Sequence, residues 1–410
     1  MAMSAALRSP GTACRARRRL GATLGAVALA VGGLVALGAP AGATDFTPSP
    51  ATADGDPNSL RDVIENQATT DGDIVILTAG ATYVLTLGEI NPAAAVTIEG
   101  NGATIQQTSG GDNLLESGFD LTLRNVTLTG GHEPDDGGAI DMNGGDLTIV
   151  NSTLVGNCAA DAAGAIENED DDTVIIASTL ANNDADDDAG AVRSKRGDLL
   201  IVNSTITNNT QENFGAVDSG QVDAVDAQLT IVYSTIVDNA VDTSTPCDVG
   251  DAGVGDARVG DGDIDDDEDV GTAQFLVANI AAADSFASFG TVVALPTGGQ
   301  NCEISNPGSQ GYNFSDDDTC GFTNVAKGDR EDAGDPGLGA LADNGGPTQT
   351  MLPLATSPLV NFIPVAACGG GDALAGFAVV DDQRGIARPQ DVGCEIGSVE
   401  LEALVVTFTG

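Results

Sequence analysis

A repeat of 26 residues is the feature that most constrains this chain. The segment LTLRNVTLTGG at residue 121 returns as LTIVNSTLVGN at 147, TVIIASTLANN at 173, LLIVNSTITNN at 199 and LTIVYSTIVDN at 229. A second element keeps step with it, as GGAID at 137, AGAIE at 163, AGAVR at 189 and FGAVD at 214. VTIEGNGATI at 96 is an earlier copy. Repeats of this length indicate a solenoid whose units stack on one another.

Each unit contains three short runs in which apolar and polar residues alternate, separated by Gly, Asn and Asp. The pattern predicts three strands per coil, each stacked about 4.8 Å from its copy in the next coil. We therefore expect an all-β fold, a right-handed parallel β-helix. The predicted inner ladders are Ile140, Ile166, Val192 and Val217 on the first sheet, and Leu123, Ile149, Ile175, Ile201 and Ile231 on the second.

Two columns of asparagine follow the same period. One column, at the bend between the second and third strands, includes Asn151 and Asn203; the other, at the end of the third strand, is Asn157, Asn183, Asn209 and Asn239. Asn tolerates the left-handed backbone of a tight bend, and stacked amides can hydrogen-bond along the axis. We interpret both columns as structural ladders, although Asn151-Ser152-Thr153 is also a glycosylation acceptor sequence.

The N-terminus has the pattern of an export signal. Arg15 to Arg19 precede an apolar stretch and then Ala41-Gly42-Ala43, so residues 1–43 read as a signal peptide and the mature chain keeps no transmembrane segment. Export would place six cysteines in an oxidising compartment. Cys302 with Cys320 and Cys368 with Cys394 are the expected disulfides, because each pair closes a short loop. The pairing of Cys158 and Cys247 stays open.

The composition limits the partners. There are 61 acidic and 15 basic residues, and the net charge of -46 disfavours nucleic acid, which needs a basic face. Hydrophobic residues are 41% of the chain and are arranged periodically, so disorder is not expected. At the start of the solenoid, Ser59 and Asp62 predict a helix whose apolar residues Leu60, Val63 and Ile64 cap the first coil.

Segments at both ends of the repeats resemble those of a known family. They are SLRDVIENQATTDGDIVILTAGATYVLTL (59–87), preceded by Asn58, and DPGLGALADNGGPTQTMLPLATSPLVN (335–361) with DDQRGIARPQDVGCEIGSVE (381–400). The first is similar to the CSLREA-type segment, with Asn58 in place of the cysteine, and the other two to the C-terminal block, of the bacterial β-helix proteins called choice-of-anchor Q domain proteins. The resemblance implies a pectin-lyase-like β-helix on the cell surface or outside the cell, and no established activity.

These features divide the chain into five parts. They are a signal peptide (1–43), an N-terminal cap with the first coils (44–95), the β-helix (96–334) with an acidic excursion (242–271), the C-terminal block (335–400) and a tail (401–410).

One row of charged residues is the candidate catalytic site. Asp141, Glu167, Arg193 and Asp218 are expected to point outward from the first sheet, one coil apart. Carboxylates about 5 Å apart are spaced as in retaining glycosidases. The row also resembles the calcium-and-arginine arrangement of polysaccharide lyases, which implies calcium on the carboxylates and Arg193 as base. The alternative is that outward positions of an acidic protein are simply acidic.

Two further patterns could bind a ligand. In the acidic excursion, Asp261, Asp263, Asp265 and Asp267 are oxygen ligands of the kind calcium prefers, or a solvated loop. Thr127, Thr153, Thr179, Thr205 and Thr235 form an outward row that could bind carbohydrate or ordered water. Beside it, Val150, Ile176, Val202 and Val232 form an apolar outward row that needs a cover, for which we expect the C-terminal block or the acidic excursion.

The sequence supports two functions. The preferred one is a secreted, non-enzymatic protein that presents an extended face to a glycan or cell-envelope partner, as an adhesin does. The alternative is a calcium-dependent polysaccharide lyase or glycosidase acting on the first sheet. Calcium is the one cofactor that the sequence suggests, and the oligomeric state is left open.

Overall fold

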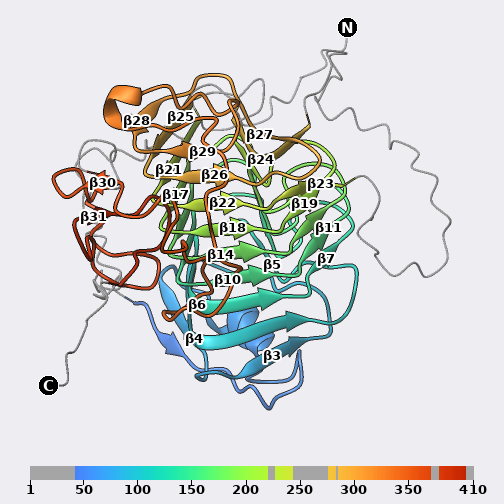
Figure 1. Cartoon of the computed structure of the whole chain (residues 1–410). Coiled ribbons are helices and arrows are strands. Elements are labelled where there is room, and N and C mark those ends of the chain that lie inside the picture. The colour runs from blue at the N-terminus through green and yellow to red at the C-terminus, as the bar shows by residue number, and fades with distance from the viewer. Residues whose placement is uncertain (1–41, 220–226, 243–275, 283–284, 371–377, 403–410) are drawn as a thin grey trace, which may run out of the picture.

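The computed structural model describes residues 42–219, 227–242, 276–282, 285–370 and 378–402. These residues form a parallel β-solenoid of about nine turns, with coils of about 26 residues, which confirms the predicted fold class. Figure 1 shows the coils stacked from β3 and β4 at one end to β27 and β28 at the other, with the C-terminal block along one side.

The largest sheet has 17 strands and contains the second and third strands of the coils. In β4 (Val96–Gln107) and β6 (Leu121–Thr129) one strand runs through the bend and supplies both. The second strands are otherwise β2 (Asp73–Ile76), β9 (Leu147–Val150), β13 (Thr173–Ile176), β17 (Leu199–Val202), β21 (Gln228–Val232), β25 (Ser285–Phe289) and β28 (Ser309–Gly311), preceded by β1 (Asp45–Phe46). The third strands are β3 (Thr82–Leu85), β10 (Thr153–Val155), β14 (Thr179–Ala181), β18 (Thr205–Thr207), β22 (Thr235–Val237), β26 (Val292–Ala294) and β29 (Phe314–Ser315).

The first strands of the coils form a seven-stranded parallel sheet. They are β5 (Leu115–Ser117), β8 (Ile140–Met142), β12 (Ile166–Asn168), β16 (Val192–Ser194), β20 (Val217–Ser219), β24 (Val277–Ala282) and β27 (Gln300–Ile304). Five coils also have a fourth strand of two residues, which the repeat did not reveal. These strands are β7 (His132–Glu133), β11 (Cys158–Ala159), β15 (Asp184–Ala185), β19 (Thr210–Gln211) and β23 (Ala240–Val241).

The core is a stack of aliphatic rungs. Every residue of the predicted inner ladders on the first two sheets is fully buried. The ladders are in register, with Ile166 opposite Ile140 and Val192, and Ile175 opposite Ile149 and Ile201. Each coil buries on its neighbours the apolar face that it could not bury alone, and this is why many thin units fold together.

The second asparagine column forms a chain of buried side-chain hydrogen bonds. Asn157 Nδ2 donates to Asn183 Oδ1 at 3.0 Å, and the same bond repeats from Asn183 to Asn209 and from Asn209 to Asn239. Asn239 continues it to Asn279, and Asn279 to Asn301, at 2.8 and 2.7 Å. The ladder therefore extends two rungs beyond the repeats that predicted it.

The first column acts through the backbone instead of through amide pairs. Asn151 and Asn203 have φ values of 51° and 48°, and Ala177 and Tyr233 take the same left-handed conformation in the coils that lack Asn. This conformation costs a residue with a Cβ roughly 1–2 kcal/mol, and Asn is among the residues that tolerate it best. The bend is thus set by the stacked strands, and Asn is preferred but not required.

A short helix caps the first coil. α2 (Leu60–Asp62) continues into the π-helical η2 (Val63–Gln67), and Ser59 Oγ accepts a hydrogen bond from Asp62 N at 3.1 Å as N-cap. Leu60, Val63 and Ile64 are buried in the solenoid core, as predicted. A 3-10 turn, η3 (Val325–Lys327), lies beyond the last strands of the solenoid.

The C-terminal block covers the apolar outward row. Ile176, Val202 and Val232 are buried in a second hydrophobic cluster with Met351, Leu359, Ile363, Val379 and Ile396, and Val150 packs against its edge. The short antiparallel pair β30 (Ile363–Pro364) and β31 (Gly393–Cys394) lies in this block. The expected cover is therefore the C-terminal block; the acidic excursion from 243 to 271 lies outside the described residues.

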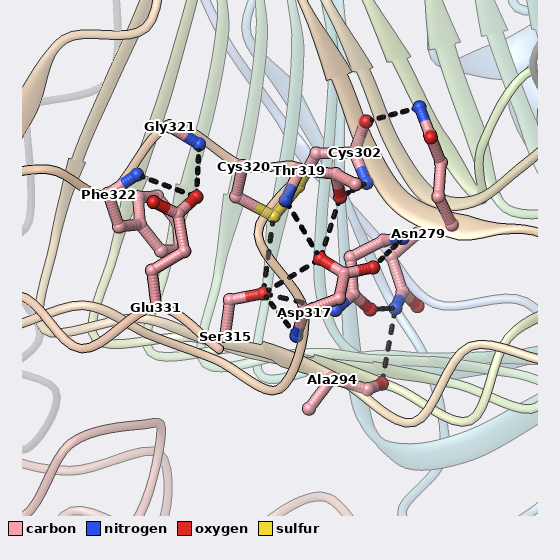
Figure 2. Close-up of a disulfide and its surroundings, with 12 residues drawn as sticks. Asn279, Ala294, Cys302, Ser315, Asp317, Thr319, Cys320, Gly321, Phe322 and Glu331 are labelled. Atoms are coloured by element: carbon pink, nitrogen blue, oxygen red, sulfur yellow. Dashed lines mark hydrogen bonds between the residues drawn. A yellow bond between two sulfur atoms is a disulfide. The ribbon is translucent and has the colours of Figure 1, made fainter. Parts of the chain in front are cut away.

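Both expected disulfides are present. One disulfide joins Cys368, in the turn after β30, to Cys394 in β31, and the other joins Cys302 in β27 to Cys320 in the loop after β29. Figure 2 shows the second pair beside Thr319 and Asp317, where Thr319 Oγ1 accepts from Cys302 N at 3.0 Å and donates to Asp317. Cys158 is also disulfide-bonded. Cys247, like the signal peptide up to residue 41, lies outside the described residues.

Candidate functional site

The four candidate catalytic residues lie in one row on the first sheet. β8, β12, β16 and β20 place Asp141 opposite Glu167, Glu167 opposite Arg193, and Arg193 opposite Asp218. Glu116 on β5 extends the row below Asp141. The stacking expected from the repeat therefore brings them together, but most of the row is closed to solvent: Glu167 is fully buried, Arg193 and Asp218 are 8% and 9% exposed, and Asp141 is partly exposed.

Two cations hold this row together. Lys195, just after β16, places its Nζ 2.7 Å from Glu167 Oε1, 3.3 Å from Asp136 Oδ2 and 3.6 Å from Glu169 Oε1. Arg193 lies 3.4 Å from a carboxylate oxygen of Asp188 and 3.5 Å from one of Asp218. Both cations are therefore surrounded by carboxylates, and Glu167 Oε2 is a buried atom with no hydrogen-bond partner.

Burial shifts the titration of both carboxyls in the middle of the row. It raises the pKa of Asp141 to about 7, with repulsion from Glu116 and Asp136 adding to the effect. Burial and Asp136 raise the pKa of Glu167 to about 8, although Arg193 and Lys195 oppose this shift. For Arg193, burial favours the neutral form, but Asp218, Glu167 and Asp188 outweigh it and hold the pKa above its ordinary value.

These shifts do not match the roles that either enzyme requires. An arginine base must give up its proton, and the carboxylates around Arg193 stabilise the protonated form. A retaining glycosidase needs one carboxyl protonated and its partner ionised at the same pH. Asp141 and Glu167 shift in the same direction, so the row resembles a buried ion network more closely than an acid and nucleophile pair.

Calcium remains a hypothesis for this chain. Within the described ranges, no three His, Cys, Asp or Glu side chains converge as metal ligands. Asp141 and Glu167 are neighbours in register, but Lys195 and Arg193 take up positions that a cation would need. Asp261, Asp263, Asp265 and Asp267 lie outside the described residues.

The threonine row is longer than the repeats indicated. Thr82 and Thr104 stand in register below Thr127, so the ladder runs Thr82, Thr104, Thr127, Thr153, Thr179, Thr205 and Thr235. The upper three are buried under the C-terminal block. In the lower coils Thr82 is exposed, and Thr104, Thr127 and Thr153 are partly exposed.

The upper rungs hydrogen-bond the block that covers them. Thr205 Oγ1 donates to Gln383 Oε1 at 2.6 Å, and Gln383 Nε2 donates to Thr179 Oγ1 at 3.0 Å. Thr179 Oγ1 donates to the carbonyl oxygen of Gln349 at 2.6 Å. Ser398 Oγ lies 3.1 Å from the hydroxyl of Thr205 and 3.2 Å from that of Thr235. Three of the five threonine hydroxyls that could bind a ligand are therefore already hydrogen-bonded to other groups of the protein.

Several residues of these two surfaces were not identified from sequence. Lys195 could have been found, since it lies two residues after Arg193 and so on the same edge of the coil. Thr82 and Thr104 were missed because they lie in early coils, after Ala81 and Ala103, where the sequence departs from the 26-residue repeat. Gln383 carried no signal, because its partner Thr179 is 204 positions away.

A hollow of about 450 Å³ lies at the last coil, lined by Phe322, Thr323, Val325, Asp329, Arg330, Glu331 and Ala333. Its charges are engaged inside the protein. Arg330 donates to the carbonyl of Pro358 and lies over the rings of Phe314 and Phe362. Glu331 accepts from the backbone of Gly321 and Phe322, as Figure 2 shows.

No protein family, curated protein or solved structure matches this chain. The fold places the protein in the class of parallel β-helices. The likeness to choice-of-anchor Q proteins has no support from these comparisons. None of the helices that the structure describes is long and apolar enough to cross a membrane.

Proposed function

We propose that this protein is a secreted or cell-surface β-helix without enzymatic activity, and that it binds a glycan along the open part of its threonine ladder. The surface comprises Thr82, Thr104, Thr127 and Thr153, with Val84 and Val155 two residues further along their strands. A choice-of-anchor Q-type protein would have this location, and the disulfides fit an oxidising compartment.

One observation carries the proposal. The same ladder hydrogen-bonds polar groups wherever the C-terminal block lies on it, through Gln349, Gln383 and Ser398. In the coils below Thr179 the ladder continues in register, and its hydroxyl-bearing side chains there are exposed or partly exposed. A flat row of hydroxyls with a few apolar neighbours suits a sugar chain, which offers hydroxyls at its edges and C–H groups on its faces.

The second candidate, a polysaccharide lyase or glycosidase, rests on the raised pKa of Asp141 and Glu167. Perturbed carboxyls are frequent in active sites, but ion networks produce them too. The burial of Glu167 and the pairing of Arg193 and Lys195 favour the network.

A single screen separates the two functions. The protein is immobilised and exposed to polysaccharides, with and without calcium, and both retention and release of reducing or unsaturated ends are measured. We expect retention of a glycan without release of new ends. Turnover that disappears in Asp141→Asn or Arg193→Ala would instead establish the enzyme, and retention of no glycan at all would overturn the binding function.

A further inference from the structure

A pair of buried carboxyl groups lies at the contact between the C-terminal block and the solenoid. Glu395 and Glu400 are 1% and 0% exposed. They flank the segment 396–399, and Glu400 Oε1 accepts a hydrogen bond from Glu395 N at 3.0 Å. The two glutamates therefore tie together the ends of that segment.

The segment between the glutamates contacts the solenoid directly. Gly397 N donates to the carbonyl oxygen of Gly290 at 2.8 Å, and Ser398 N donates to Thr235 Oγ1 at 3.1 Å. Ile396 is buried in the hydrophobic cluster that covers the apolar outward row. A change in the spacing of the two glutamates would therefore disturb the attachment of the block.

Arg388 is the cation that faces this pair. Its Nη1 lies 2.5 Å from Glu400 Oε1, and its guanidinium group lies over the ring of Tyr233 in the solenoid, 4.1 Å from the ring centroid. The neighbouring Arg384 donates to the carbonyl oxygen of Glu400, but its charge is paired with Asp382 at 2.8 Å. One positive charge therefore faces two carboxyl groups.

The Glu395 carboxyl is placed to carry a proton. Its Oε1 accepts from Asn361 N at 3.1 Å, whereas its Oε2 is buried and has no hydrogen-bond donor among the described residues. An ionised oxygen in that position is costly, and a protonated one can donate to Glu400. Burial, the hydrogen bond to Glu400 and repulsion from its carboxylate raise the pKa of Glu395 to about 8, although backbone hydrogen bonds from Asn361 and Leu401 oppose the shift. Burial raises the pKa of Tyr233 to about 12, so its phenol stays neutral while Glu395 titrates.

We propose that a proton shared by Glu395 and Glu400 holds the C-terminal block on the solenoid, so that rising pH loosens the block and uncovers the apolar outward row. Loss of the proton places two carboxylates beside one guanidinium group. Their repulsion then acts on both ends of the segment that contacts the solenoid. This inference goes beyond the proposed function and does not depend on it.

The docked block holds a proton that the released block has lost. In the released block the Glu395 carboxyl is solvated and returns to its ordinary pKa of 4.5, whereas in the docked block its pKa is about 8. The contribution of this proton to docking is full below about pH 4.5, falls by up to about tenfold for each pH unit between about 4.5 and 8, and is lost above about pH 8.

Hydrogen exchange of the intact protein, measured by mass spectrometry from about pH 6 to about pH 9, tests the proposal. Protection factors are compared, because they remove the pH dependence of the exchange reaction itself. We expect protection at residues 393–402 to fall by at least about tenfold between about pH 6 and pH 8, relative to β4 and β6 in the lower coils. The fluorescence of Nile red, an uncharged apolar dye, should rise over the same range as the apolar row is uncovered.

Glu395→Gln is the informative variant, because its side-chain amide can donate to Glu400 at every pH. In this variant the ratio of protection between the block and the lower coils should not change with pH, and Nile red should not respond. The matched control is Asp391→Asn, an exposed carboxyl of the same block, which should behave as the wild type does.

The wild type alone can overturn the proposal. A protection ratio that stays constant from about pH 6 to about pH 9 would show that no proton holds the block. An equal loss of protection in the lower coils would show that the whole solenoid opens, and a fall in Glu395→Gln as steep as that of the wild type would show that the proton is not on this pair.

Discussion

The buried asparagines of the ladder fix the register between coils, because each makes several hydrogen bonds to the coils next to it. Asn183 donates from its backbone and side chain to Asn209 Oδ1, donates to the carbonyl of Leu154, and accepts both donors of Asn157. All of these groups are buried, so each one that loses its partner costs about 1–3 kcal/mol. The ladder thus penalises any coil that slips along its neighbour.

Asn183→Ala should lower the free energy of unfolding by about 3 kcal/mol, because it leaves buried donors of Asn157 without an acceptor. Denaturant titration measures the change. The control is Asn143→Ala, an exposed loop amide, for which we expect less than about 0.5 kcal/mol. A loss for Asn183→Ala as small as that of the control would mean that the ladder is not a source of stability.

Glu167 links the ion network to pH. Its pKa is raised to about 8 in the folded protein, above the ordinary value of 4.5, so the folded state holds a proton that the unfolded state has lost. Stability from this group is present below about pH 4.5 and is lost as the pH rises to about 8. Asp141, with a pKa of about 7, acts in the same direction.

Glu167→Gln should therefore flatten the dependence of melting temperature on pH between about 5 and 8, since Gln keeps the shape and cannot ionise. Melting curves at a series of pH values measure the slope. Glu116→Gln, at the lower end of the same row, is the control, and its slope should stay closer to the wild type. An unchanged slope in Glu167→Gln would show that Glu167 is ionised throughout this range.

At the scale of elements, the sequence predicted the strands and narrowed their cover to two segments, the C-terminal block and the acidic excursion. Alternation of apolar residues placed Ile149, Ile175 and Ile201 in the core, because a strand has a period of two and the coils repeat. The outward apolar row from Val150 to Val232 indicated that another segment must cover this face. Its identity depends on contacts such as Gln383 with Thr179, which no local pattern encodes.

The candidate site was predictable to the same extent. Register alone aligned Asp141, Glu167, Arg193 and Asp218. Their burial was not predictable, because it depends on Lys195 and on Asp136 and Asp188 in turns between coils. Three of the five predicted ladder threonines are covered, and this too could not be predicted, because the residues that contact them lie more than a hundred positions later in the sequence.

The disulfide in the C-terminal block should govern the stability of that block. Cys368 and Cys394 are 26 positions apart, and closing such a loop stabilises the folded state by about 3 kcal/mol. Replacing both by Ser should increase amide hydrogen exchange in the block and at Ile176, Val202 and Val232 beneath it. The matched control is the double Ser variant of Cys302 and Cys320, which should loosen the last coils instead. An increase in exchange in the first coils as large as that in the block would show that the Cys368–Cys394 disulfide does not act on the block specifically.

At the scale of the whole molecule, charge is carried on turns and outward rows around an apolar interior. Asp146, Asp172 and Asp198 stack at successive coils, where each carboxylate accepts a backbone N–H from the next coil. Burial and repulsion from Asp198 and Asp146 raise the pKa of Asp172 to about 6, although the hydrogen bond from the Asp198 backbone opposes the shift. Repulsion among such columns opposes folding, and salt screens it.

Melting temperature should therefore rise as sodium chloride is increased from low to high ionic strength at neutral pH. The same series with calcium chloride at matched ionic strength shows whether a specific cation adds to screening. A melting temperature that is flat across the sodium series would mean that the acidity serves solubility alone.

We propose separate roles for two surfaces of the solenoid: the threonine ladder binds a glycan, and the acidic row stabilises the fold. The direct measurement is the affinity for the glycan that the immobilised protein retains in the polysaccharide screen, with the ligand recovered afterwards and weighed by mass spectrometry, for wild type, Thr127→Val with Thr153→Val, and Asp141→Asn. We predict an intact ligand in every case, binding that is lost in the threonine variant, and binding that is unchanged in Asp141→Asn. A shortened ligand, or binding abolished by Asp141→Asn and kept by the threonine variant, would contradict the account.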